Sequence, residues 1–319
     1  VAAERLLIFT DEGIYMVPKS ESQPLTPKTL AFRSVSEIGC AAPRPVRSDG
    51  AILYLDSTRR VVREARYDDN SLSYTTNAVS LAAEHLIDLP DELAAYAGAG
   101  EAPERFAVLR RPGGSLAIFH SIAAEKIGSW WPWGTEGAIE SVAALGSDLV
   151  AIVARTIGGN TVRSLERFDP TLAALDATKK ATAGSPTRSF AGFAHLASTT
   201  VSVVSRGHDL GDVTVGADGS ITLPDTAPEV DEIEAGFAFH QVMRPVPYYF
   251  AETQTGPASA MRKTVVRALI NVVKSQSFMV NGAPLLLPNQ GDDFATPSPT
   301  IEGWREAHMA GVSEEAQFD

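Results

Sequence analysis

A strand–turn–strand unit that recurs along the first half of the chain constrains the fold more than any other feature. Short apolar or alternating runs are interrupted by turns near Glu12, Thr58, Gly113 and Gly159. The intervals of roughly 45 to 55 residues match the length of one four-stranded blade of a β-propeller. The turns contain Asp-Glu-Gly, Pro-Gly-Gly and Gly-Gly-Asn, which tolerate positive φ. The pattern predicts an all-β fold that begins with a partial or complete β-propeller over residues 1–189.

One segment of this region departs from the β pattern. Between Ala78 and Leu89, apolar residues recur at helical spacing, and Pro90 ends the run. We therefore predict one short helix, Val79–Ile87, inserted between two blades.

The composition changes after the blades. From Thr171 to Ser189 the chain is rich in Ala, Thr, Lys, Ser and Pro, which is typical of an exposed connection, so we place a domain boundary there. Residues 190–236 hold short strands separated by glycine turns and predict a small β-barrel.

A further β-rich domain is predicted for residues 237–319. The β-branched residues of Lys263–Val273 and the turn in "VNGAP" favour strands over a helix. The chain begins at Val1 without a methionine and ends in a polar stretch. We therefore expect a segment of a longer polypeptide, with this last domain truncated.

Composition excludes several classes of protein. A net charge of −12 and a pI near 5.0 argue against a protein whose main function is to bind nucleic-acid phosphates, because that needs a concentrated basic face. The single cysteine, Cys40, excludes a disulfide within the chain and a zinc site built on thiolates. Because its neighbours are apolar, we predict that Cys40 is a small buried hydrophobic residue. No run approaches the roughly 18 to 20 apolar residues of a membrane span.

The common catalytic and cofactor motifs do not occur. The sequence has no Gly-x-Ser-x-Gly elbow and no phosphate-binding glycine loop, and its six histidines lack metal-ligand spacing. The stretch Arg206–Asp212 holds one histidine and two aspartates, but this is more typical of a polar loop than of a ligand set. We therefore predict no enzyme activity, no cofactor, and no catalytic, cofactor-binding or metal-binding residue.

Four arginines crowd one limb of the predicted hairpin Pro45–Tyr74: Arg59, Arg60, Arg63 and Arg66. Neither face of the predicted strand Val61–Tyr67 is cleanly apolar, which is typical of an outer blade strand. We interpret the arginines as candidate subunit contacts that form forked pairs with carboxylates of a neighbouring subunit or domain. The sequence leaves open an equally weighted alternative, a solvated face with internal pairs to Glu64, Asp68 and Asp69.

Three of the four tryptophans lie close together: Trp130, Trp131 and Trp133. Exposed aromatic rings could stack on sugars, whereas a tryptophan near the end of a propeller strand more often packs between blades. Pro132 argues against a regular central strand for at least one of them. We favour a core or subunit-contact role over a ligand-binding role for this group.

Several stretches occur in a characteristic order: "LLIFTDEGIYMV", then "TLAFRSVSEIGC" through "YDDNSLSY", then "SLAAEHLI". Further along lie "SVAALGSDLVAIVARTIGGNTVRSLERFD", "GADGSITLPD" and "PTIEGWREAHMAGVSEEAQFD". This succession resembles the tail proteins of tailed bacteriophages related to the tubular nozzle of short-tailed phages. In that family the last three stretches look like a blade, the small barrel and the approach to the C-terminus. The barrel is likened to the first catalytic-cysteine half-domain of ubiquitin-activating enzymes, a likeness of fold and not of chemistry.

The resemblance implies a structural component of a phage virion, a nozzle or hub-like ring or tube that retains DNA and conducts it during ejection. It implies a homo-oligomer, expected to be a hexamer, that contacts tail adaptor or portal-proximal proteins and tail fibres. DNA would pass transiently without specific binding, and a negatively charged wall would keep phosphates from adhering. The alternative hypothesis is a β-propeller binding module or glycan hydrolase that acts on host surface carbohydrate through the tryptophan stretch.

Overall fold

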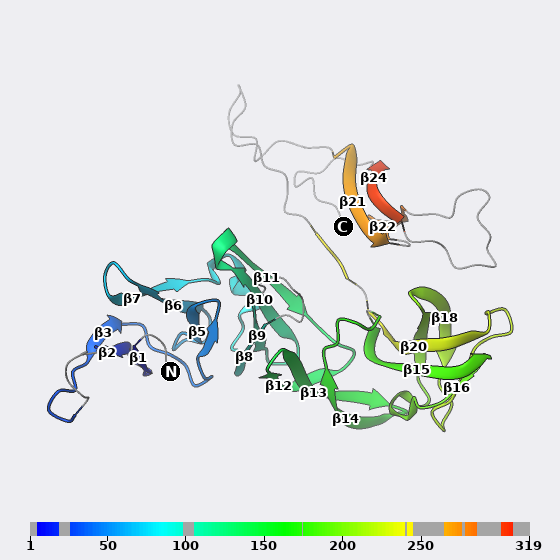
Figure 1. The fold of residues 1–319 in the computed structure, drawn as a ribbon, viewed down its shortest axis with the longest axis horizontal. Helices are drawn as coiled ribbons and strands as arrows, with labels where there is room; N and C mark the ends of the chain where they lie inside the picture. The colour runs from blue at the N-terminus through cyan, green and yellow to red at the C-terminus, as the bar shows by residue number, and fades with distance from the viewer. Residues whose placement is uncertain are drawn as a thin grey trace. The chain divides into compact units, whose positions relative to one another are not determined.

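The structure is a computed structural model that describes residues 5–18, 26–97, 105–173, 175–239, 241–244, 265–275, 278–285 and 301–308. Its regular structure is almost entirely β-strand, which confirms the predicted all-β class (Figure 1). The chain divides into two compact units, residues 1–202 with 212–237 and residues 203–211 with 238–319. The predicted domain boundaries at 189 and 236 stay predictions.

Four antiparallel meanders follow one another in the first unit, each with its strands in chain order. The first sheet contains β1 (Leu6–Phe9), β2 (Ile14–Val17) and β3 (Arg33–Ser36). The second contains β4 (Val46–Ser48), β5 (Ala51–Leu55), β6 (Val62–Asp68) and β7 (Ser73–Ala78). The third contains β8 (Glu92–Ala97), β9 (Arg105–Arg110), β10 (Leu116–Ile122) and β11 (Ile127–Trp133). The fourth contains β12 (Ala138–Leu145), β13 (Asp148–Ile157) and β14 (Asn160–Arg167). All four predicted turns join neighbouring strands of one sheet.

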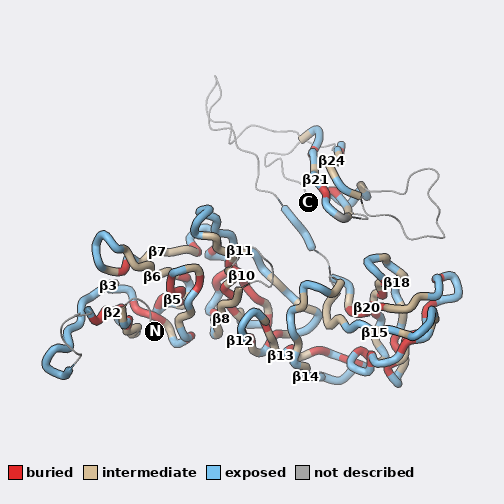
Figure 2. Tube along the Cα trace, viewed as in Figure 1, coloured by how far each residue is buried: buried red, intermediate tan, exposed pale blue. Residues whose placement is uncertain are grey.

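Strand β5 shows how the second sheet is packed on both sides. All five of its residues are buried, as the red stretch in Figure 2 shows. Ile52 and Tyr54 pack in a core with the first sheet, whereas Leu53 and Leu55 pack with residues of the third sheet. Because successive side chains of a strand point to opposite faces, one continuous apolar run supplies two cores.

The third sheet repeats this arrangement. Ala117 and Phe119 of β10 pack toward the second sheet, and Leu116 and Ile118 pack with residues of the fourth. The four meanders therefore form a face-to-face stack in chain order. Neighbouring propeller blades pack in this way, but the arrangement of blades around a common axis stays a prediction.

The predicted helix between blades forms as a 3₁₀ helix, η1 (Leu81–Leu86), between β7 and β8. It spans fewer residues than the predicted Val79–Ile87, and Ala83 within it has a non-helical φ of −128°. Ala83 and Leu86 are buried in the core between the second and third sheets. A second 3₁₀ turn, η2 (Ala123–Glu125), joins β10 to β11.

A fifth sheet has the strand order β15-β20-β17-β18. Its strands are β15 (Leu175–Thr187), β17 (Thr200–Ser205), β18 (His208–Thr214) and β20 (Val230–Ala238). The interpretation of residues 171–189 as an exposed connection is wrong for β15. Many of its residues are half-buried or exposed, so the strand tolerates the polar composition that resembles a loop.

Short elements accompany this sheet. They are the paired strands β16 (Ser189–Phe190) and β19 (Ile221–Thr222), and the 3₁₀ turn η3 (Ala194–Leu196). The predicted short strands of residues 190–236 are therefore present, while closure into a small barrel stays a prediction.

The described residues that follow β20 form two antiparallel pairs. Strand β21 (Arg267–Ser275) pairs with β24 (Ile301–His308), and β22 (Met279–Val280) pairs with β23 (Ala283–Pro284). β21 confirms strand for residues 267–273 of the predicted segment Lys263–Val273. The "VNGAP" turn places Asn281 and Gly282 at φ of 49° and 75°, as a tight hairpin requires.

In the part of the chain that the structure describes, no helix has the length and apolar character to cross a membrane.

A buried arginine joins the fourth sheet to β15 within the first unit. Arg155 of β13 is only 5% exposed and donates Nε–H and Nη2–H to both oxygens of Glu166, at 2.7 Å each. It also donates to both oxygens of Asp176 on β15, at 2.8 and 2.9 Å, and to Thr135 Oγ1 at 2.7 Å. Burial alone would lower the pKa of Arg155, but these carboxylates raise it, so the guanidinium stays charged.

Replacing Arg155 should destabilise the first unit strongly. Arg155→Leu leaves two carboxylates without their partner in a mostly buried site, which costs about 3–5 kcal/mol of unfolding free energy. Arg163→Leu is the matched control, because Arg163 forms a forked pair with Glu140 but its side chain is 60% exposed. Urea unfolding followed by circular dichroism should show a much larger loss for Arg155→Leu; similar losses for both variants would contradict this.

The same network predicts a loss of stability in acid. Burial raises the pKa of Asp176, but hydrogen bonds from Arg155 and Thr135 and the charge of Arg155 lower it further, so its net pKa lies below the ordinary value. A depressed folded-state pKa contributes stability above the unfolded pKa of about 3.9, and this is lost as the pH falls through the folded pKa. Asp176→Asn should therefore flatten the decline in unfolding free energy below about pH 4. A decline in Asp176→Asn that runs parallel to that of the wild-type protein would refute the assignment.

Candidate functional site

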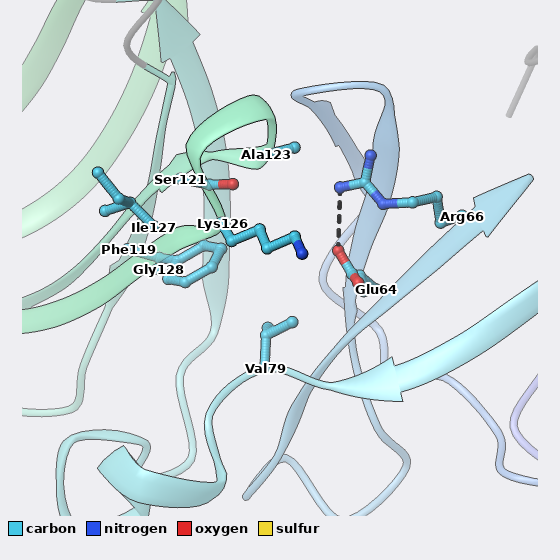
Figure 3. A pocket seen from close by; sticks show the side chains of 9 residues that line it. All are labelled: Glu64, Arg66, Val79, Phe119, Ser121, Ala123, Lys126, Ile127 and Gly128. Atoms are coloured by element: carbon cyan, nitrogen blue, oxygen red, sulfur yellow. Dashed lines mark hydrogen bonds and ion pairs between the residues drawn. The ribbon is translucent and has the colours of Figure 1, made fainter.

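An open groove of about 440 Å³ lies between the second sheet and the β10–β11 hairpin of the third sheet (Figure 3). Charged and polar residues from both sides line it together with an apolar group: Glu64, Arg66, Ser121 and Lys126, with Val79, Phe119, Ala123, Ile127 and Gly128. The groove is where the structure brings part of the arginine-rich hairpin close to the start of the tryptophan-bearing strand.

The turn between β4 and β5 fixes one wall of this groove. Asp49 and Gly50 have φ of 49° and 74°, which gives a tight two-residue hairpin. The Asp49 carbonyl accepts a hydrogen bond from Arg66 Nη1 at 3.0 Å. Its carboxylate accepts from Ser121 Oγ at 3.1 Å and from the Ala123 amide. Asp49 therefore ties the second sheet to the β10–η2 connection.

Lys126 supplies the free charge of the groove. Its backbone is left-handed, with φ of 56°, and Figure 3 shows its side chain extending toward Glu64 and Arg66. Among the described residues Lys126 has no ion pair, whereas Arg66 Nη2 pairs with Glu64 at 3.3 Å. The groove can therefore accept an acidic group beside an apolar body that contacts Phe119 and Ile127.

Three of the predicted arginines have different surroundings. Arg59 lies in a turn and donates Nε–H and Nη2–H to the Pro90 carbonyl at 3.0 and 2.8 Å, so it holds the loop before β8. Arg60 is exposed and has no ion pair in the described part of the chain. Arg66 pairs with Glu64, as the internal-pairing alternative expects.

The fourth, Arg63, points to the opposite face of the second sheet from Arg66, because successive residues alternate. The expected outer position of its strand is wrong. β6 pairs with β5 on one side and with β7 on the other, and Val62 and Ala65 are fully buried. The mixed pattern arises because Val62 and Ala65 fill cores while the longer arginine and glutamate side chains of β6 stay partly exposed.

The internal-pairing alternative also named Asp68 and Asp69, and these two aspartates have different environments. Asp68 accepts hydrogen bonds from the amides of Asn70 and Ser71 and so shapes the β6–β7 turn. The hydrogen bond with Ser71, followed by that with Asn70, holds the pKa of Asp68 below its ordinary value. Asp69 is exposed in the same turn.

The three tryptophans lie on both faces of β11, the outermost strand of the third sheet. Trp130 stacks on Phe119 at 4.7 Å between ring centroids and donates Nε1–H to the Val79 carbonyl at 2.8 Å. Trp133 packs edge-on to Phe168 at 5.1 Å. Trp131 is 36% exposed. It lies edge-on to Phe106 and His120, at 6.1 and 6.2 Å between ring centroids. All three rings are therefore engaged within the first unit, and an edge strand tolerates Pro132.

Cys40 is 9% exposed, which confirms the prediction of a buried residue. It packs in the core between the first and second sheets with Leu7, Met16 and Tyr54. Burial raises the pKa of its thiol to about 11.

No group of three or more histidine, cysteine, aspartate or glutamate side chains with the geometry for a metal ion occurs among the described residues. In the stretch Arg206–Asp212, Arg206 and Gly207 form the turn between β17 and β18.

Sequence reasoning missed Asp49, Ser121 and Lys126. The signal for Asp49 was present, since Asp-Gly between apolar runs predicts a tight hairpin turn. Its contact with Ser121, 72 positions away, depends on the stacking of two sheets and has no local signal.

Comparison with protein families gives no matching family model, and comparison with curated proteins gives no match.

Cys40 should be unreactive in the folded protein. A thiol with a pKa of about 11 is only about 0.1% thiolate at pH 8, and the thiolate is the reactive form. A disulfide-exchange reagent should label Cys40 slowly in buffer and quickly in urea. Cys40→Ser should fold with a packing loss of about 1 kcal/mol. Rapid labelling of the native chain would show that the site is open.

Proposed function

We propose that this protein is a structural component of a phage tail, a nozzle or hub-like ring or tube that retains DNA in the virion and conducts it during ejection. The observation that carries the proposal is the stack of four antiparallel meanders, in which the inner sheets bury both faces. This arrangement agrees with the blades that the sequence resemblance implies.

The outer face of the fourth sheet supports self-association. Ile152 of β13 and Leu165 of β14 are paired in register on this face and are 41% and 75% exposed, and Leu145 of β12 is 66% exposed. The opposite face of the same sheet packs on the third sheet. A second copy that lays a sheet on this face would continue the stack, and repeated contacts of this kind generate a ring or a filament.

Charge is the second support. A net charge of −12 would make the wall of a channel repel DNA phosphates, so that DNA passes without binding. By resemblance we propose six copies in a virion, in contact with tail adaptor or portal-proximal proteins and with tail fibres.

The carbohydrate-binding alternative has less support. Sugar rings stack on exposed, flat aromatic surfaces. Here Trp130 and Trp133 are engaged with Phe119 and Phe168. Trp131 is 36% exposed but lies edge-on to Phe106 and His120.

The outer face provides a direct test. The purified chain should assemble with increasing concentration, and Ile152→Lys with Leu165→Glu should weaken assembly at least about tenfold because charged groups would then be desolvated at the contact. Leu81→Glu is the matched control, since Leu81 is 64% exposed on η1, away from that face. Mass photometry and electron microscopy report the assembled state, and thermal melts report folding. A chain that stays monomeric at every concentration would count against the proposal, and rings unaffected by the double change would reject this face as the contact.

A further inference from the structure

The groove between the second sheet and the β10–β11 hairpin has the composition of a small-molecule site. Its volume of about 440 Å³ lies within the roughly 300–1,000 Å³ of ligand pockets, which combine apolar surface with a few polar groups. Phe119 and Ile127 supply the apolar surface, while Arg66 and Lys126 supply positive charge (Figure 3). The hydrogen bond from Ser121 to Asp49 connects the two walls, so the groove is formed before a ligand arrives.

Lys126 occupies a backbone position that does not favour lysine. It ends the 3₁₀ turn η2 with φ of 56° and ψ of 32°, in the left-handed region that glycine adopts most readily. Other residues held in this region at a conformational cost occur often at functional sites. The side chain is exposed, extends into the groove and pairs with no acidic residue that the structure describes (Figure 3). Its ammonium is therefore available to an anion from outside the chain.

Gly128 leaves the apolar part of the groove open. Its φ lies outside the range that requires glycine, and it pairs with Ser121 in the regular β10–β11 ladder, so the backbone there accepts any side chain. A Cβ at this position would lie 3.5 Å from the Phe119 ring, which is an ordinary contact. A larger side chain would cover the ring and fill the groove. The glycine therefore leaves room for a ligand beside Phe119.

The charges that line the groove favour a singly charged anion. Arg66 pairs with Glu64, so the charges of these two side chains offset each other. Lys126 adds a positive charge in a chain whose net charge is −12. A phosphate carries more negative charge than one ammonium can balance, whereas a carboxylate carries a single charge. If the carboxylate is attached to an apolar body, that body packs against Phe119 and Ile127 and is removed from water.

We propose that this groove binds a small carboxylate with an apolar body. Lys126 recognises the carboxylate, Phe119 and Ile127 contact the apolar body, and Gly128 provides the space for it. The site does not rest on the proposed tail function, because all of its residues belong to one copy of the chain.

Three probes test the class of ligand at neutral pH and constant ionic strength. Phenylacetate has a carboxylate on an aromatic body, phenylacetamide has the same shape without the charge, and acetate has the charge without the ring. In ¹⁵N NMR spectra, phenylacetate should shift the amide signals of Ala123 and Gly128 saturably, with a dissociation constant of about 1 mM. Phenylacetamide should bind about tenfold more weakly, and acetate should bind more weakly still.

Two variants separate the charge of the groove from its space. Lys126→Gln should weaken phenylacetate binding about tenfold and leave phenylacetamide binding unchanged, because only the charged probe uses the ammonium. Gly128→Val should abolish binding of both, since its side chain would occupy the groove, and valine suits a strand. The controls are Lys28→Gln, at an exposed lysine before β3, and Gly184→Val, at an exposed glycine of β15 with open space around it. Both controls should bind like wild type, and thermal melts should show that all four variants fold.

A third variant should bind more tightly. Glu64→Gln removes the acidic side chain that lines the groove and frees Arg66, so phenylacetate should bind severalfold more tightly. A purely structural role of these residues would not raise the affinity. The proposal would be overturned by the absence of saturable shifts up to about 10 mM phenylacetate, by equal binding of the charged and neutral probes, or by wild-type affinity in a folded Lys126→Gln variant.

Sedimentation then separates a free ligand from an acidic side chain of a second copy. If the ligand is a free carboxylate, neither phenylacetate nor Lys126→Gln changes the association of the chain. If both weaken association, the groove holds an acidic side chain of a second copy, and the proposal of a free ligand is overturned. Phenylacetate binding by a chain that forms no ring would count against the tail proposal and leave this site intact.

Discussion

Burial of both faces of one short strand is the constraint on which the first unit depends. Each residue of β5 is inside the protein, and alternate residues contribute to separate cores. Fully burying a leucine or isoleucine side chain contributes about 1.5–3 kcal/mol, so Ile52, Leu53 and Leu55 together hold three sheets in order. A polar residue at any of them would weaken the core on its own side of the sheet.

Polar contacts add further connections between neighbouring sheets. Arg155 reaches from β13 to a carboxylate on β15, and Asp49 reaches from the β4–β5 turn to the β10–η2 connection. Both use several hydrogen bonds to one side chain. Such contacts are directional, so they fix how neighbouring elements are aligned with each other. Apolar packing fixes only the distance between them.

The sequence predicted the strands of the first unit well because their turns and alternation are local signals. The turns near Glu12, Thr58, Gly113 and Gly159 all join paired strands. β15 was missed because a half-exposed strand needs few apolar residues and resembles a loop in composition. The inserted helix was placed correctly but as a regular helix, since spacing does not reveal the break at Ala83.

The candidate sites were less predictable because their contacts join residues far apart in the sequence, which leave no local signal. The arginine-rich hairpin was recognised, but the surroundings of Arg63 and Arg66 depend on which face of β6 each occupies and on what packs there. The partners of Arg155 lie 11 and 21 positions away, on another strand and another sheet. No spacing rule relates such residues.

Pro132 limits which strands can pair with the exposed edge of β11. It lies in β11, at the outer edge of the third sheet, and it has no backbone N–H to donate. A proline in an edge strand opposes the addition of another strand beside it and so protects against uncontrolled sheet extension. Pro132 therefore opposes pairing of a further strand with β11 at this border of the third sheet.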